Sequence, residues 1–267
     1  MISVCIIAKN EEKNIERCLR SVSWADEIIL IDAESNDRTC ELAKALGAKV
    51  LVKRWEGYSV QKEFAVNQAV HEWVLAVDAD EEVTEKLMLE IQNILKNQPP
   101  IKGFEIPRKS FFLGKWIRYG GWYPGYQLRL FRKLSVRMNH RPVHEGFQID
   151  GEVGKLESDI NHYSYDSLHH YLEKMNDYSS LDVANKLKKT EKVFWYNFVL
   201  NPLSSFLRTY FSLQGYKDGI HGFLLSLYSA LHVLVIYCKV WEYQQAQLSN
   251  SILPPVSSED INRLKFQ

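Results

Sequence analysis

Four short apolar runs alternate with helix-like segments over the first hundred residues. The runs have the length of buried strands and occupy residues 2–8, 27–31, 48–52 and 73–77. The segments that follow them carry helical periodicity or helix boundary signals, at residues 10–22, 37–46, 59–70 and 84–96. Repeated strand–helix alternation is typical of parallel sheets, because parallel neighbours need long crossover connections. The sequence therefore predicts an α/β chain with a mostly parallel, Rossmann-like sheet flanked by helices.

The most informative motif ends the fourth run, where residues 73–82 read WVLAVDADEE. Ligands of open α/β sheets bind beyond the carboxyl ends of the strands, which is where Asp78 and Asp80 are expected. Two residues apart on an extended chain, their side chains point the same way. Carboxylates at this spacing suit a Mg²⁺ or Mn²⁺ ion that also holds substrate phosphates. The alternative is a strand followed by an acidic helix N-terminus, where the helix dipole favours carboxylates.

Polar residues also follow the first two predicted strands. Asn10 and Glu11 come after the first, and Asp32 ends the second. We expect these residues to share one crevice with the DAD motif, where they can bind a nucleoside base or a ribose. Asn10 and Asp37 also stand where side chains cap helices.

Composition and motif searches exclude several classes of protein. Lys and Arg number 33 and Asp and Glu number 33, so no overall basic field favours a nucleic-acid partner. The chain has neither G-x-G-x-x-G nor the P-loop motif, which disfavours dinucleotide oxidoreductases and P-loop NTPases. The start of the chain lacks the pattern of a signal peptide, so a cytoplasmic location is expected.

Three motifs closely resemble those of family 2 glycosyltransferases, which have the GT-A fold. They are VCIIAKNEEKNIERCLRSV (4–22), DEIILIDAESNDRT (26–39) and YSVQKEFAVNQAVHEWVLAVDADEE (58–82). Within that family the chain is most similar to the lipopolysaccharide inner-core β-1,4-glucosyltransferase group, over residues 1–165. The resemblance implies that Asn10 and Glu11 contact the nucleoside, Asp32 the uracil, Asp78 the ribose and diphosphate, and Asp80 the metal.

Further site residues are expected on both sides of this region. Lys62 is either a contact to the donor diphosphate or a lysine on a helix surface. The family-like V-H-E-G setting implies that Glu145 is the base that takes a proton from the acceptor hydroxyl. His162 matches a position of a second metal or diphosphate contact, or else is a packed histidine. Of Arg129 and Arg132, one is expected to face phosphate or an anionic acceptor, and the other solvent.

Aromatic residues crowd the remaining segments. Residues 111–126 combine aromatic rings with glycines, as expected either for a wall against sugar rings or for a loop that buries its rings. Residues 166–267 are expected to form a helical extension, in which 219–241 approaches the length of a membrane span. We expect these helices to lie on a membrane surface. A cap that binds a second subunit and a true membrane span are the alternatives.

Together these features predict a GT-A domain at residues 1–165 and an aromatic-rich helical extension at 166–267. The resemblance implies an inverting, Mg²⁺- or Mn²⁺-dependent enzyme that moves glucose from UDP-glucose to a heptose of the lipopolysaccharide core. It would use a lipid-linked oligosaccharide acceptor at the cytoplasmic face of the inner membrane. The alternatives are another acceptor, such as a capsule intermediate or a polypeptide, and a nucleotidyltransferase.

Overall fold

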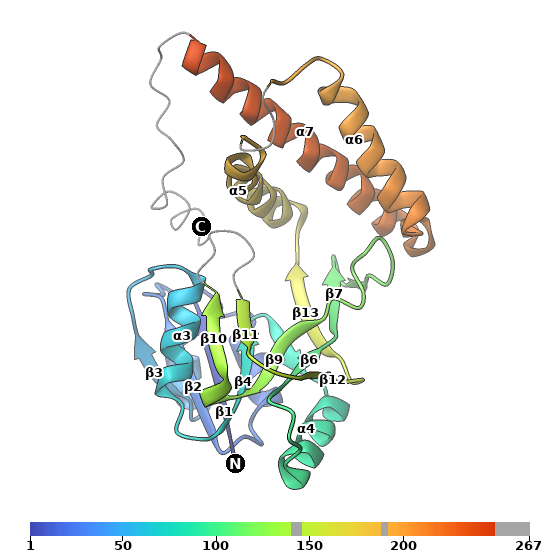
Figure 1. The fold of residues 1–267 in the computed structure, drawn as a ribbon. Helices are drawn as coiled ribbons and strands as arrows, with labels where there is room; N and C mark the ends of the chain where they lie inside the picture. The colour runs from blue at the N-terminus through green and yellow to red at the C-terminus, as the bar shows by residue number, and fades with distance from the viewer. Residues whose placement is uncertain (140–145, 188–191, 249–267) are drawn as a thin grey trace. The chain divides into compact units, whose positions relative to one another are not determined.

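The computed structural model describes residues 1–139, 146–187 and 192–248, and it divides into two compact units. Unit 1 contains residues 1–110 and 124–164, and unit 2 contains 111–123 and 165–267 (Figure 1). The sequence prediction placed 111–123 in the first domain, but in the structure this segment belongs to unit 2. Its rings pack with those of the C-terminal helices, as in the edge-to-face pair of Phe112 and Tyr171.

Unit 1 is built on a seven-stranded sheet in the order β12-β6-β9-β4-β1-β2-β3. Its strands are β1 (Ile2–Ala8), β2 (Glu27–Asp32), β3 (Lys49–Val52), β4 (Trp73–Asp78), β6 (Gly103–Ile106), β9 (Gln127–Arg132) and β12 (Val153–Lys155). The four strands predicted from the N-terminal repeats are neighbours and parallel. β9 runs antiparallel to both β4 and β6, so the whole sheet is mixed.

The helices of unit 1 cover both faces of this sheet. They are α1 (Ile15–Ser21), α2 (Thr39–Ala45), α3 (Tyr58–Gln68) and α4 (Glu85–Asn97). Successive residues of a strand point to opposite faces, and β1 shows the result. Val4 and Ile6 join the core cluster that contains α1, α2 and α4 residues, whereas Cys5 and Ile7 join the cluster that contains α3. Strands buried on both faces explain the continuous apolar runs.

Two smaller sets of strands lie outside the seven-stranded sheet. The hairpin of β10 (Val136–Asn139) and β11 (Gly146–Ile149) packs against the α3 side of the sheet. A second sheet has the order β5-β13-β7-β8, formed by β5 (Glu81–Val83), β13 (Ile160–Tyr165), β7 (Arg108–Phe112) and β8 (Lys115–Trp116). A short 3₁₀ helix, η1 (Lys133–Ser135), follows β9.

Two predicted helix caps are wrong. Asn10 lies in the left-handed region with φ of 55°, and α1 begins at Ile15 after Asn14. Asparagine tolerates this conformation because its short side chain bonds locally. For α2 the residue before the helix is Arg38, although Asp37 still accepts the N–H of Thr39 at 3.0 Å.

Unit 2 is helical apart from the segment 111–123. It contains α5 (Leu168–Leu187), α6 (Asn197–Leu207), the π-helical η2 (Arg208–Ser212), the 3₁₀ helix η3 (Gly215–Asp218) and α7 (Ile220–Leu248). α5 and α6 both pack on α7 (Figure 1). Residues 220–247 of α7 are long and apolar enough to cross a membrane by length and composition, and 28% of their apolar window is buried.

Candidate functional site

The carboxyl ends of β1, β2 and β4 meet at one edge of the sheet. In the parallel register Ala8 lies opposite Asp32, and Ile7 lies opposite Asp78. The loops that follow these three strands therefore share this edge, which is where open α/β sheets bind ligands. The structure thus brings together most of the site residues that were predicted from the sequence.

Backbone and side-chain hydrogen bonds join the loop after β1 to the loop after β2. The N–H of Asn10 donates to Ser35 Oγ at 2.8 Å, and Asn10 Oδ1 accepts the N–H of Asn36 at 2.9 Å. The N–H of Glu11 donates to Thr39 Oγ1 at 2.8 Å. These bonds hold Asn10 and Glu11 in defined positions beside the second loop.

Asp32 is buried, with 1% of its surface exposed. Its carboxylate accepts the N–H of Ser35 at 2.9 Å and the hydroxyl of Ser35 at 2.5 Å. Asp32 therefore shapes its own loop, while a carboxylate retains further acceptor capacity for a ligand. The expected contact to uracil stays a prediction.

Asp37 orders the start of α2. It accepts the N–H and the hydroxyl of Thr39, at 3.0 and 2.5 Å, and the N–H of Glu12 at 3.1 Å. Partial burial raises the pKa of Asp37, but these hydrogen bonds outweigh it and hold the pKa below the ordinary value.

Asp78 lies in a cluster of four charged side chains. Lys62 Nζ is 2.9 Å from Asp78 Oδ1, and Arg129 donates to Asp78 Oδ2. The same Arg129 donates to Glu81 at 2.7 Å, and Glu81 accepts the N–H of Asp78 at 2.9 Å. Arg129 and Glu81 are 4% and 0% exposed, so their charges depend on each other and on Asp78.

Asp78 and Arg129 stay ionised at neutral pH. Burial alone would raise the pKa of Asp78, but Arg129 and then Lys62 outweigh it and hold that pKa well below the ordinary value. Burial would lower the pKa of Arg129, and the two carboxylates instead raise it. The charge of Asp78 is therefore balanced by protein cations.

The contacts in this cluster correct part of what was predicted for Lys62 and Arg129. Lys62 is 21% exposed at its side chain and paired with Asp78, so the helix-surface alternative is wrong. Arg129 faces Asp78 and Glu81 from within the core, so the expectation that it faces phosphate or solvent is also wrong. Arg132 pairs with Glu72 at the other end of β4.

Asp80 and Asp78 contact different side chains, and the chain between them is not extended as predicted. The chain turns at residues 79–80 between β4 and β5, so the alternation of an extended strand does not apply. Asp80 Oδ2 instead lies 3.3 Å from His162 Nε2. β5 and β13 are antiparallel with Glu81 opposite His162, and this pairing brings the two side chains together.

His162 is oriented by two hydroxyl groups. Its Nδ1 lies 2.6 Å from Ser164 Oγ and 3.3 Å from Ser110 Oγ. The Nε2 atom is thereby directed to Asp80, and only 15% of the His162 side chain and 17% of the Asp80 side chain are exposed. A carboxylate and an oriented imidazole that converge in this way are typical metal ligands.

The family is decided by comparison with known proteins. The model of the family described as Glycosyl transferase family 2 matches residues 3–144, which is more than half of the chain. The chain belongs to this family. The predicted GT-A class, with its mixed sheet, flanking helices and helical C-terminal region, is confirmed.

Two relatives of this glycosyltransferase cover most of its length. An uncharacterised glycosyltransferase from Rickettsia typhi is 33% identical over 238 residues, which are 85% of this chain and 82% of the relative. The lipopolysaccharide core biosynthesis glycosyltransferase LpsC from Rhizobium meliloti is 26% identical over 248 residues, 90% of this chain and 92% of the relative.

A more distant similarity is found among solved structures. Glucosyl-3-phosphoglycerate synthase from Mycobacterium tuberculosis, in complex with Mn²⁺, UDP and glucosyl-3-phosphoglycerate, is 26% identical. The match covers 43% of this chain and 44% of that chain, with a TM-score of 0.35.

The residues of the glycosyltransferase fit a divalent cation that is shared with a substrate. Asp80 and His162 would supply one oxygen and one nitrogen ligand, and the described residues contain no group of three or more His, Cys, Asp or Glu side chains suited to a metal. A two-ligand site needs further ligands, which water and donor phosphates can supply. The imidazole favours Mn²⁺ over Mg²⁺ at this position.

One predicted site residue is not described by the structure, and several residues of the site were not predicted from the sequence. Glu145, the predicted base, lies outside the described residues. The sequence patterns did not identify Glu81 or the two serines around His162 as site residues. The serines belong to no recognisable motif, and Glu81 lies within an acidic run. An arginine among apolar residues in LRLF was the one available signal for a buried ion pair.

We expect Arg129→Met to lower the free energy of unfolding by about 3–5 kcal/mol, because it leaves Asp78 and Glu81 without their shared cation. Chemical denaturation at neutral pH measures the change. Arg137→Met in β10 is the control, and its loss should be about 1 kcal/mol or less because both side chains of its pair with Asp150 are exposed. Equal losses in the two variants would contradict the assignment.

The lowered pKa of Asp78 determines how the free energy of unfolding changes in acid. A carboxyl whose pKa is lower in the folded state contributes stability above its unfolded pKa of about 4, and this contribution is lost as the pH falls through the folded pKa. Denaturation curves measured between neutral pH and pH 2 should therefore show a loss in acid. Asp78→Asn should have a weaker pH dependence in this range; an unchanged profile would show that other groups carry it.

Proposed function

We propose that this glycosyltransferase transfers glucose from UDP-glucose to a heptose of the lipopolysaccharide core, with inversion at the anomeric carbon. The observation that carries the proposal is the convergence of Asp80 and His162 at the edge where the loops after β1, β2 and β4 meet. The relative named as a lipopolysaccharide core biosynthesis glycosyltransferase, which this chain covers almost completely, supports the acceptor class.

The donor would lie along this edge. Asn10, Glu11 and Asp32, at the carboxyl ends of β1 and β2, would bind the nucleoside. Asp80 and His162 would hold Mg²⁺ or Mn²⁺, which when bound neutralises charge on the diphosphate. Lys62 stands beside Asp78 and would also approach the diphosphate as a point charge.

The reaction would be a single displacement. The acceptor hydroxyl oxygen forms a bond to the anomeric carbon while the bond from that carbon to the diphosphate oxygen breaks. Glu145 would take the hydroxyl proton, and UDP would leave with the electron pair of the broken bond. Attack opposite to the leaving group gives inversion.

The acceptor is proposed to be a lipid-linked oligosaccharide at the cytoplasmic face of the inner membrane. Large apolar side chains are exposed along one side of α6 and at the start of α7: Val199, Leu200, Leu203, Leu207, Ile220, Phe223 and Leu227. Apolar helix faces of this kind favour binding in the interfacial layer of a bilayer. The same side chains would serve a second subunit if the protein is a homo-oligomer.

We expect UDP-glucose or UDP to raise the melting temperature in the presence of Mn²⁺ or Mg²⁺. A ligand that binds only the folded state stabilises it by about 2.7 kcal/mol when the ligand concentration is 100 times its Kd. The panel includes GDP-sugars, nucleoside triphosphates and EDTA. Asp80→Asn should lose the metal-dependent part of the shift, whereas Asp166→Asn, an exposed carboxylate at the end of β13, should keep it. A shift with triphosphates alone would refute the donor.

The base assignment has its own variant. Glu145→Gln should lower kcat by about 10²–10⁴-fold while donor binding is retained, because only proton transfer is removed. Glu152→Gln, an exposed carboxylate in the same unit, is the matched control. The measurement is the rate of UDP release together with the rate of glucose transfer to the acceptor. Full turnover by Glu145→Gln would show that Glu145 is not the base.

A further inference from the structure

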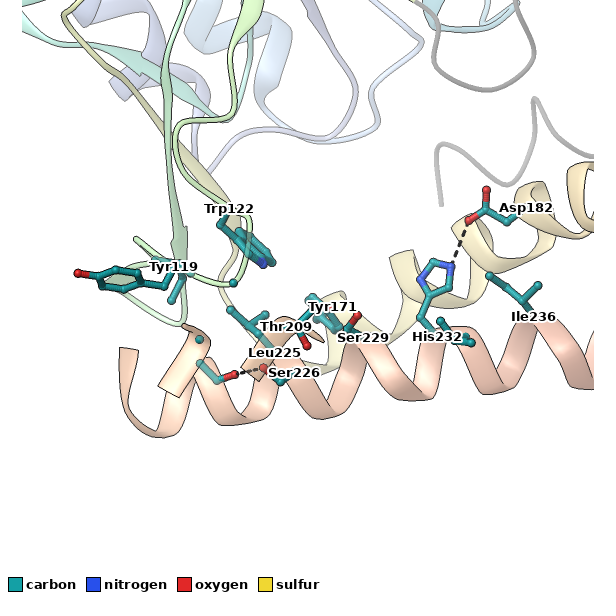
Figure 2. Close-up of a pocket in the computed structure, with 15 residues that line it drawn as sticks. Tyr119, Trp122, Tyr171, Asp182, Thr209, Leu225, Ser226, Ser229, His232 and Ile236 are labelled. Atoms are coloured by element: carbon teal, nitrogen blue, oxygen red, sulfur yellow. Dashed lines mark hydrogen bonds and ion pairs between the residues drawn. The ribbon is translucent and has the colours of Figure 1, made fainter. Parts of the chain in front are cut away.

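Unit 2 contains a cavity that the proposed reaction does not use. Its volume is about 390 Å³, and it is lined by the segment 111–123 together with α5, η2, η3 and α7 (Figure 2). This volume lies within the range of about 300–1,000 Å³ that is usual for small-ligand sites. All lining residues belong to unit 2, so the cavity is a property of that unit alone.

The wall formed by 111–123 is anchored by a buried carboxylate. Asp218 of η3 is 3% exposed and accepts the N–H groups of Arg118 and Tyr119 at 3.0 and 2.8 Å. The N–H of Gly120 donates to the carbonyl of Leu213 at 2.9 Å. These bonds join the loop to η2 and η3 without a ligand, so the cavity is preformed.

One end of the cavity is apolar. Ile117 and Leu225 are 1% and 6% exposed, and the rings of Trp122 and Tyr171 pack against their cluster. Further along α7 the lining continues with Val233 and Ile236. Such a surface favours hydrocarbon, since burial of apolar area is the main source of its binding free energy.

The serine and threonine hydroxyls in the lining are already engaged within the protein. Ser226 donates to the carbonyl of Gly222 at 2.7 Å, and Thr209 donates to the carbonyl of Ser205 at 2.9 Å. The hydroxyls of Ser229 and Ser205 lie 2.8 Å apart. A sugar would need these donors for its own hydroxyls, and it would leave polar groups unpaired without them. The cavity therefore suits an aliphatic chain better than a sugar.

The opposite end is polar and reaches solvent. His232 Nε2 of α7 lies 3.2 Å from Asp182 Oδ2 of α5, with 28% and 40% of the two side chains exposed. Figure 2 shows this pair at the end of the lining away from Tyr119 and Trp122. A polar, solvent-exposed end and a buried apolar end match the two parts of an amphiphile.

We infer that the cavity of unit 2 binds one acyl chain of a lipid, with the head group beside Asp182 and His232 and the chain along Val233 and Leu225 toward Trp122. The chain would come from the lipid part of the acceptor or from a phospholipid of the bilayer. Only the first source rests on the proposed function.

Monoacyl phosphocholines with eight to fourteen carbons, titrated below their micelle concentrations, test the inference by calorimetry without any donor. Affinity should rise by up to about fourfold per added methylene until the chain fills the cavity. Val233→Phe should weaken binding at least tenfold because it fills the cavity, whereas Cys238→Phe, at an exposed position of the same helix outside the lining, should change it less than twofold. Absence of saturable binding, or equal binding by both variants, would overturn the inference.

A second measurement does not depend on a cavity-filling variant. A monoacyl phosphocholine brominated near its terminal methyl group should quench tryptophan fluorescence in the wild-type protein, and Trp122→Phe should lose most of this quenching. Unchanged quenching in Trp122→Phe would place the chain elsewhere. Melting temperatures of all variants establish that they fold, and Ile236→Phe replaces Val233→Phe if the latter does not.

Competition identifies the source of the chain. If it belongs to the acceptor, dodecylphosphocholine should raise KM for the lipid-linked acceptor and leave KM for the delipidated oligosaccharide unchanged. If it belongs to the bilayer, dodecylphosphocholine should instead reduce binding to phospholipid vesicles. Acyl binding without a metal-dependent UDP-sugar shift would refute the proposed function alone, and the reverse result would refute this inference alone.

Discussion

The arrangement of the candidate site depends on one buried arginine. Arg129 of β9 bonds to both Asp78, at the end of β4, and Glu81, at the start of β5. Buried charges are tolerated only when they are paired, so these three residues hold the short turn between the two strands in one conformation. Because the turn is held, Asp80 within it faces His162 on the neighbouring β13. The antiparallel strand β9 thus supports a site that is otherwise built from parallel strands.

The two aspartates of the DAD motif consequently occupy different environments. Asp78 is balanced by Arg129 and Lys62, and its pKa is held well below the ordinary value. Asp80 has an imidazole beside it and no such pair of cations among its described ion pairs. Asp80 therefore lies beside an imidazole, whereas Asp78 lies between two cations. This difference in environment separates the roles of two residues that look alike in the sequence.

Unit 2 contributes a different kind of chemistry. Its long helix α7 carries apolar side chains on more than one side, some packed against α5 and α6 and others exposed. The segment 111–123 closes a cavity against these helices through the carboxylate of Asp218. Glycines and aromatic rings in this segment were expected to form either a sugar wall or a buried loop. In unit 2 the Phe112 ring is buried, whereas the rings of Trp116, Tyr119, Trp122 and Tyr123 are partly exposed.

The amino-acid sequence by itself determined the four parallel strands, the helices between them and the edge at which polar residues collect. These features depend on local periodicity and on chain connectivity, which the order of residues contains directly. The tertiary structure alone decided that Asp78 and Asp80 contact different side chains, that Arg129 is buried between two carboxylates and that Asn10 bonds to the second loop instead of capping a helix. Each of these outcomes depends on contacts between residues far apart in the chain, and the free energy of pairing buried charges and polar groups there exceeds local preferences.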